Sequence, residues 1–171
     1  MLQRVSGETG ARVAGPTARR RRVVGLGAGV LALLVVRLVL VAPVAVSGQS
    51  MTPTVDDGAV VLVALRADPA GLGRGDVVVL RDPEGALSLK RVAGLAGDTV
   101  AILDAVLTVN GRAVDEPYLD LATVDGSFAP QVLVPGGHVY VLGDNRDRSV
   151  DSRDYGTVPL EDVLGPVLLT W

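Results

Sequence analysis

Residues 76–111 read DVVVLRDPEGALSLKRVAGLAGDTVAILDAVLTVNG, and this stretch decides the fold class. It contains four short runs that are rich in Val and Leu: Asp76–Leu80, Leu87–Val92, Thr99–Leu103 and Val106–Val109. Turn residues separate these runs, and the dipeptide Asn110-Gly111 is the strongest short-range signal of a β-hairpin. The stretch therefore predicts successive strands that pair with one another.

Similar runs continue on both sides of this stretch, at Ala59–Leu65, Val132–Val134, Val139–Leu142 and Val163–Thr170. No segment after Val46 keeps the apolar spacing of an amphipathic helix over three turns. We therefore expect an all-β domain over residues 47–171, built as a compact, folded or partly closed antiparallel sheet.

An apolar segment precedes the expected β domain. Residues 23–46 carry one charge, Arg37, and are long enough to cross a bilayer as a helix. Because Arg19–Arg22 come directly before this segment, the positive-inside rule places the N-terminus in the cytoplasm and the β domain outside the cell membrane. We expect a disordered cytoplasmic tail at residues 1–22 and a single transmembrane helix at residues 23–46. The alternative is a cleavable signal peptide, since small residues at 42–45 follow an apolar core.

Composition narrows the chemistry that the 171-residue chain can perform. The absence of Cys excludes disulfides and thiolate sites, and the single His, His138, excludes a multi-histidine metal centre. His138 begins an apolar run, where a structural role is the simpler interpretation. Acidic residues outnumber basic ones from Ser47 onward, so nucleic-acid binding is not expected.

Lys90 is the only Lys among the 16 basic residues of the chain, and the others are Arg. Arg is not deprotonated in proteins, so Lys90 is the only basic side chain besides His138 that can become a neutral proton acceptor. Strand alternation sends Lys90 and Arg91 to opposite faces of their strand.

Three polar segments lie next to expected strands: Ser47–Thr54, Lys90–Val100 and Gly143–Arg153. They contain the blocks SMTPT, KRVAGLAGD and GDNRDRSVDSR, and the block GDVVV at residues 75–79 lies between the first and the second. In kind and order these four blocks resemble those of type I signal peptidases, the membrane-bound serine proteases that remove signal peptides from exported proteins. The resemblance spans Ser47–Arg153 and implies an all-β scaffold that needs no metal and no cofactor.

By this resemblance, Ser50 is the nucleophile, Lys90 is the general base, and Ser149 forms a hydrogen bond to the Lys90 amine. The chemistry of the residue types agrees, because a Ser hydroxyl needs a neighbouring base to become a nucleophile. Burial lowers the pKa of a Lys, so a buried Lys can serve as that base near neutral pH.

The resemblance also implies supporting contacts around this dyad. Ion pairs of Asp144 with Arg91 and of Asp151 with Arg153 are expected to hold the third segment against the Lys90 strand, and ordinary surface pairing is the alternative. Main-chain N–H groups at Ser50 and Gly48 are expected to stabilise the oxyanion.

At several positions the chain departs from the family pattern, or the role of the residue has an alternative. Some members of the family have a second Ser where this chain has Gly48, so a hydroxyl donor to the oxyanion is in question. Met51 is expected to line a substrate pocket, with core packing as the alternative. Ala96, Arg148 and Asp154 stand where the family usually has Pro, Asn and an aromatic residue.

The expected substrates are signal peptides with small residues, typically Ala, one and three positions before the cut, bound in extended form at a sheet edge. The lipid bilayer is the second expected partner, and the sequence does not indicate an oligomeric state. A specialised relative, such as a conjugation-pilin maturation peptidase, and a non-catalytic membrane-anchored binding module remain as alternatives. A self-cleaving repressor would carry a DNA-binding N-terminus, and the presence of Ser50, Lys90 and Ser149 argues against the binding module. A structural envelope protein that uses the β domain only for assembly is a further alternative.

Overall fold

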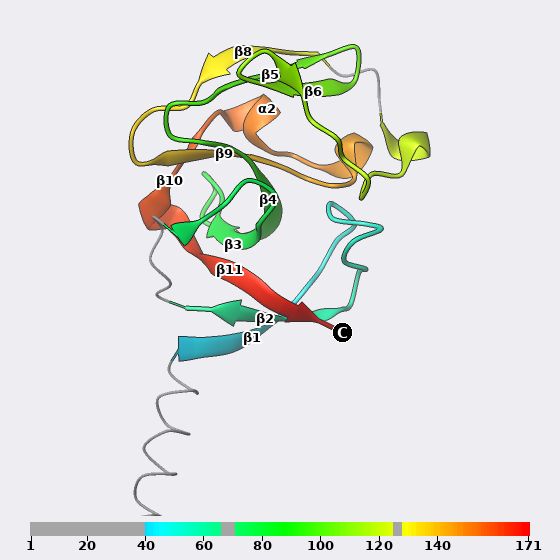
Figure 1. Ribbon diagram of the computed structural model, residues 1–171. Coiled ribbons are helices and arrows are strands. Elements are labelled where there is room, and N and C mark those ends of the chain that lie inside the picture. Colours follow the sequence, from blue (N-terminus) through cyan, green and yellow to red (C-terminus); the bar gives the residue numbers. More distant parts are fainter. Residues whose placement is uncertain (1–39, 66–70, 125–127) are drawn as a thin grey trace, which may run out of the picture. The chain divides into compact units, whose positions relative to one another are not determined.

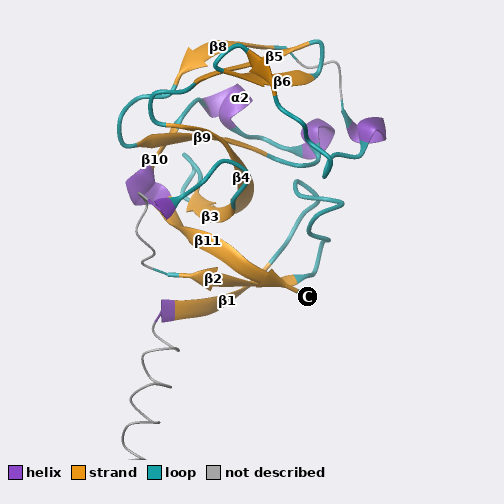
Figure 2. Ribbon diagram, in the orientation of Figure 1, coloured by secondary structure: helices purple, strands orange, loops and turns teal. Residues whose placement is uncertain are grey.

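The computed structural model describes residues 40–65, 71–124 and 128–171, and within these ranges the long regular elements are strands, joined by loops and short helical turns (Figure 2). The strands are β1 (Val41–Ala45), β2 (Val60–Ala64), β3 (Val77–Arg81), β4 (Leu87–Leu95), β5 (Thr99–Leu103), β6 (Val106–Val109), β7 (Arg112–Ala113), β8 (Ala129–Leu133), β9 (His138–Leu142), β10 (Val158–Pro159) and β11 (Val163–Thr170). Helical turns are short: α2 (Ser152–Tyr155), η2 (Leu121–Thr123), η3 (Arg146–Arg148) and η4 (Leu160–Asp162). The all-β expectation is confirmed.

The strands form two antiparallel sheets. The larger one has seven strands in the order β1-β2-β11-β3-β4-β9-β10, and the smaller one has four in the order β7-β6-β5-β8. In Figure 1, β5, β6 and β8 lie above β9, and β11 runs below β3 toward β2. The chain passes from the larger sheet to the smaller one at the turn between β4 and β5. Lys90 lies in β4, which pairs with β3 on one side and β9 on the other, so it lies inside the larger sheet.

The predicted Asn110-Gly111 turn joins β6 to β7. Both residues have positive φ angles, 53° and 73°, as a two-residue type I′ hairpin requires. A second two-residue turn of this kind, between β5 and β6, uses Asp104 and Ala105 at φ angles of 49° and 67°. The sequence did not mark this turn, because Ala has no preference for left-handed backbone.

Strand β1 corrects the expected boundary between membrane helix and β domain. Residues Val41–Ala45 pair with β2 in antiparallel register, from Val41 opposite Ala64 to Ala45 opposite Val60, so the β domain begins before Ser47. Pro43 lies in the middle of this segment, where it would break a helix but is tolerated in an edge strand. The expected tail at residues 1–22 and the expected helix up to residue 39 lie outside the described residues. Among the described residues, no helix combines the length and apolar character that crossing a membrane requires.

The hydrophobic core has one cluster between the two sheets and two clusters within the larger sheet. Between the sheets lie Val100, Ile102, Leu107, Tyr140 and Leu142, all 2% exposed or less. The larger sheet bends where β11 leaves β3 and continues along β2, with register shifts on both sides. Gly165 makes this possible, because a Cβ atom at this position would lie 1.8 Å from the Ala64 carbonyl oxygen.

Candidate active site

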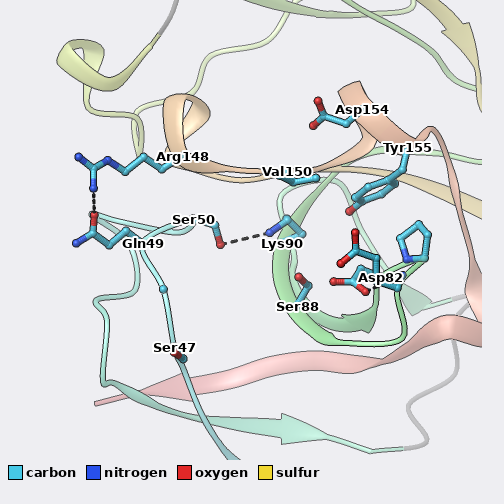
Figure 3. Close-up of a pocket in the computed structure, with 13 residues that line it drawn as sticks. Ser47, Gln49, Ser50, Asp82, Ser88, Lys90, Arg148, Val150, Asp154 and Tyr155 are labelled. Carbon is cyan, nitrogen blue, oxygen red and sulfur yellow. Dashed lines mark hydrogen bonds between the residues drawn. The ribbon is translucent and has the colours of Figure 1, made fainter.

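Ser50 and Lys90 meet at the surface of the larger sheet. Ser50 lies in the turn that follows β1, Lys90 lies in β4, and the Lys90 Nζ donates a hydrogen bond of 3.3 Å to the Ser50 Oγ (Figure 3). Lys90 is only 3% exposed. The structure thus brings the expected nucleophile together with the expected base, although 39 residues separate them along the chain.

The surroundings of Lys90 lower its pKa. Burial lowers its pKa from the ordinary value of 10.5, because desolvation penalises the ammonium. The carboxylates of Asp151 and Asp82 oppose this effect, and the Arg153 guanidinium adds to it. The net result is a lowered pKa, which raises the fraction of Lys90 that can accept a proton near neutral pH.

Arg91 points away from Lys90, as strand alternation predicts. Its Nε and Nη2 donate to the two oxygens of Asp144 at 2.8 and 2.6 Å, and its Nη1 donates to the Gly75 carbonyl at 2.7 Å. The ring of Tyr118 covers the guanidinium, with its centroid 3.8 Å away. This bidentate, largely buried pair joins β4 to the loop after β9.

Asp151 and Arg153 also form the expected ion pair, with an Nε to Oδ1 distance of 2.8 Å. Asp151 is fully buried, and its Oδ2 accepts a hydrogen bond of 2.9 Å from the Gly143 N–H. Arg153 Nη2 donates to the carbonyl oxygens of Arg146 and Ser149. The pair therefore organises the whole loop between β9 and α2.

The expected hydrogen bond between Ser149 and Lys90 is absent from the structure. Within the described part of the chain, the buried Ser149 Oγ has no hydrogen-bond partner, and the Lys90 amine donates to Ser50 instead. Ser149 still lies at the site: a Cβ atom on Gly143 would fall 2.2 Å from the Ser149 Oγ and 2.6 Å from the Ser50 carbonyl oxygen.

The backbone around the nucleophile offers one of the two expected oxyanion donors. The Gly48 N–H donates to Asp57 Oδ1 at 2.9 Å, so it is already occupied, which corrects its expected role. The Ser50 N–H has no acceptor among the described residues and remains available to a ligand.

Met51 belongs to the core rather than to a substrate pocket, and this corrects the expectation that it lines one. It is 1% exposed and packs with Val55, Val61, Val63, Val79 and Leu89. Met51 lies in the turn that contains Ser50, and the Val55 N–H donates to its carbonyl oxygen at 2.9 Å. His138 begins β9, its Nδ1 lies 3.1 Å from the Gly136 carbonyl oxygen, and it lines neither of the two hollows at Ser50.

Sequence reasoning missed a buried support for this site in the segment before η2. Glu116 forms an ion pair with Arg146, and both side chains are nearly inaccessible. The Tyr118 hydroxyl donates to the same Glu116 carboxylate at 2.6 Å. No short motif marks the pair of Glu116 with Arg146, because it joins the loop before η2 to η3, 30 residues further along the chain.

Two residues that depart from the family pattern have local partners. Arg148 donates from Nη1 to the side-chain oxygen of Gln49, next to the nucleophile (Figure 3). Asp154 accepts from the Asp151 N–H at 3.0 Å and completes a capping box at the start of α2. Ala96 is exposed in the turn between β4 and β5.

Two hollows meet at Ser50. The smaller, of about 120 Å³, has mostly aliphatic walls: Val44, Ala45, Val46, Ser47, Ser50, Val79, Leu87, Ser88 and Leu89. The larger, of about 480 Å³, is polar and includes Gln49, Asp82, Glu84, Lys90, Arg148, Asp154 and Tyr155 (Figure 3). The dyad is therefore accessible from two adjoining hollows, one lined by aliphatic and Ser residues and one that also includes charged residues.

The chain matches the family model described as signal peptidase, peptidase S26, over residues 19–171. It belongs to this family. A signal peptidase I of Bacillus licheniformis is 42% identical over 136 residues, which cover 73% of this chain and 72% of that protein. A signal peptidase IB of Staphylococcus aureus is 33% identical over 162 residues, 85% of each chain.

A solved structure of the S26 family has the same fold. The crystal structure of a signal peptidase I from Enterococcus faecalis V583 superposes with a TM-score of 0.50 at 35% identity, and it covers 57% of this chain and 97% of that one. Membership of the family makes the chain a hydrolase of the serine peptidase class.

Proposed function

We propose that the chain is a membrane-anchored signal peptidase that cleaves exported preproteins with a dyad of Ser50 and Lys90. The observation that carries this proposal is the 3.3 Å contact of the Lys90 Nζ with the Ser50 Oγ, made by a Lys that is 3% exposed. A buried amine against a Ser hydroxyl is the arrangement that general-base activation needs.

The chemistry follows from this contact. Neutral Lys90 takes the proton of Ser50 as its Oγ attacks the scissile carbonyl carbon, and the Ser50 N–H stabilises the developing oxyanion. The Lys90 ammonium then gives the proton to the leaving amine, and an acyl-enzyme on Ser50 remains. Lys90 next deprotonates a water molecule, which attacks the ester, and the proton returns to the Ser50 oxygen as the signal peptide leaves.

The small hollow supports cleavage after small residues. Its volume of about 120 Å³ and its aliphatic lining suit an Ala side chain beside Ser50. Strand β1 is an edge of the larger sheet and leads directly to this hollow, so an extended substrate can add to it as a further strand.

The apolar residues before β1 support anchoring of the domain in the plasma membrane, with the N-terminus in the cytoplasm. Ser50 follows this segment closely in sequence. The dyad would then lie near the outer membrane surface, where a signal peptide's cleavage site emerges.

The test is to map the cut that the purified full chain makes in a preprotein with Ala one and three positions before the junction. We expect a single new N-terminus at that junction by mass spectrometry. A matched preprotein with Leu directly before the junction should remain uncut. Equal cleavage of both preproteins, or cleavage elsewhere, would contradict the proposed specificity.

A further inference from the structure

The peptide unit between Gln49 and Ser50 has two functional ends. The Ser50 N–H, at one end, has no acceptor among the described residues and is the proposed oxyanion donor. The Gln49 carbonyl is at the other end, and in a planar trans peptide the two groups point in opposite directions. Any contact that fixes the Gln49 carbonyl therefore fixes the direction of the Ser50 N–H.

Thr52 contacts this carbonyl twice, through its backbone N–H at 3.3 Å and through its hydroxyl, and the hydroxyl connects the carbonyl to Asn145. The Thr52 hydroxyl donates to the Gln49 carbonyl oxygen at 2.9 Å, and the Asn145 Nδ2 donates to the Thr52 hydroxyl at 2.9 Å. Asn145 also donates its backbone N–H to the Ser50 carbonyl at 3.0 Å. The loop after β9 thus holds the nucleophile turn on both sides of Ser50.

The direction of these bonds is determined by the chemistry of the groups. The Gln49 carbonyl can only accept, so the single hydroxyl proton of Thr52 must point to it. The hydroxyl can then only accept from Asn145, which must present its amide nitrogen. As a result, the Asn145 Oδ1 is buried without a partner in the described part of the chain, although Asn145 is only 5% exposed. A buried acceptor without a partner is unfavourable for stability, and this suggests a role other than stability.

We propose that Asn145 and Thr52 are positioning residues that orient the Ser50 N–H toward the oxyanion. This inference rests on the proposed peptidase function. Neither residue lines either hollow at Ser50, so they act through the Gln49–Ser50 peptide and not by touching the substrate. Asn145 belongs to the GDNRDRSVDSR block, whereas Thr52 occupies the unspecified position of the Ser-Met-x-Pro-Thr block, so the Thr52 half of the relay belongs to the present chain and not to the family motif.

The relay has a specific kinetic signature. The oxyanion develops in the transition state and persists in the tetrahedral intermediate but is absent from the bound substrate, so a misdirected N–H lowers kcat and leaves KM unchanged. Loss of a complete oxyanion donor lowers kcat by about 100-fold to 1000-fold. Because the donor is misdirected and not removed, we expect Thr52→Val to lower kcat by about 10-fold or more. Thr52→Ser keeps the hydroxyl and should restore most of the rate.

The experiment compares kcat, KM, pH profile and Tm of the full chain in detergent for wild type, Thr52→Val and Thr52→Ser. Thr108→Val is the matched control, because the Thr108 hydroxyl also donates to a backbone carbonyl, that of Ala101 at 3.1 Å, in the smaller sheet. We expect kcat to fall only in Thr52→Val, with an unchanged KM and an unchanged pH midpoint. Thr108→Val should change Tm alone.

Three results would overturn the proposal: wild-type kcat in Thr52→Val, a loss confined to KM, or no recovery in Thr52→Ser. If Thr52→Val does not fold, Thr52→Ala gives the same comparison with a smaller side chain. A peptide aldehyde ending in Ala, which forms a tetrahedral adduct with Ser50, should bind Thr52→Val more weakly by the same factor as kcat falls. Absence of cleavage by the wild type, in contrast, would reject the proposed function itself.

Discussion

Lys90 differs from the Arg residues of the chain because its side chain can lose its proton and its charge. Arg91, its neighbour, stays charged and is fixed by Asp144, whereas Lys90 loses solvation on burial and has a lowered pKa. The strong bias of the chain toward Arg makes this one Lys a sequence signal with a chemical reason, since an Arg cannot accept a proton. Its partner Ser50 could be named only through the resemblance of the surrounding block, because Ser is too common to stand out.

At this scale, the rate of cleavage should follow the ionisation of Lys90. The neutral amine is the active form, so kcat/KM should rise with pH through a midpoint below 10.5, the ordinary pKa of Lys. The Asp82 carboxylate favours the ammonium, so Asp82→Asn should lower the pKa of Lys90 and move the profile to lower pH. The Asn oxygen can still accept from the Glu84 and Ala86 N–H groups, which preserves the turn.

Asp104→Asn is the control for this prediction, because Asp104 lies in the distant turn between β5 and β6 and Asn tolerates its positive φ angle. It should leave the pH profile unchanged. A shift of the Asp82→Asn profile to higher pH would contradict the electrostatic account of Lys90.

At the scale of elements, the loop from β9 to α2 positions the site through close backbone contact. Gly143 lies between the Ser149 side chain and the Ser50 carbonyl, with no room for a Cβ atom. Gly143→Ala should therefore separate Ser50 from Lys90 and lower kcat/KM by about 10-fold or more, since small displacements of catalytic groups are costly.

Gly136→Ala is the matched variant, because a Cβ atom there would have no neighbour within 4 Å. We expect wild-type activity for Gly136→Ala in the same preprotein assay. Equal activity of both variants would show that the loop tolerates displacement at Gly143.

The strands show what the sequence can and cannot predict. Runs of Val and Leu between turn residues located β2–β6, β9 and β11 well, since alternation and turn chemistry are local properties. The prediction was wrong for β1, because residues 41–45 continue a long apolar run, and such a run looks the same whether it ends as helix or strand. Only its pairing with β2, a contact between distant residues, decides the outcome. The Asp57 contact that occupies Gly48 and the missing Ser149 hydrogen bond are likewise products of tertiary packing.

At the scale of the whole molecule, an acidic residue links the two sheets. Asp98 follows β4 and accepts hydrogen bonds from Arg74 Nε at 2.7 Å, the Leu95 N–H at 2.8 Å and Asn110 Nδ2 at 2.8 Å. The Arg74 hydrogen bond is the largest cause that holds the pKa of Asp98 well below its ordinary value of 3.8. A lowered folded-state pKa stabilises the protein above pH 3.8, and this stabilisation is lost as the pH falls further.

Asp98→Asn should accordingly lower the free energy of unfolding by about 2 kcal/mol at pH 7, the scale of hydrogen bonds to a charged group. The difference in the free energy of unfolding between Asp98→Asn and wild type should become smaller as the pH falls below 3.8. Urea titrations at several pH values measure this difference. Asp56→Asn, at an exposed position, should behave like wild type throughout. A difference that does not depend on pH would contradict the ionic role of Asp98.

The proposed anchor makes a prediction for the whole chain in cells. The full chain should remain with membranes after an alkaline wash, and added protease should digest the β domain from outside. Mass spectrometry of the N-terminus should find residues before Val23. A mature N-terminus near Val46 would instead support the cleavable signal peptide.

The central claim is that Ser50 is the nucleophile and Lys90 the general base of the cleavage. The most direct test compares the rate at which wild type, Ser50→Ala and Lys90→Arg process one preprotein. Both variants should fold with a Tm near that of the wild type and lose cleavage at the Ala junction, because one lacks the nucleophile and the other lacks a proton acceptor. Cleavage by either variant at the wild-type rate and position would contradict the account.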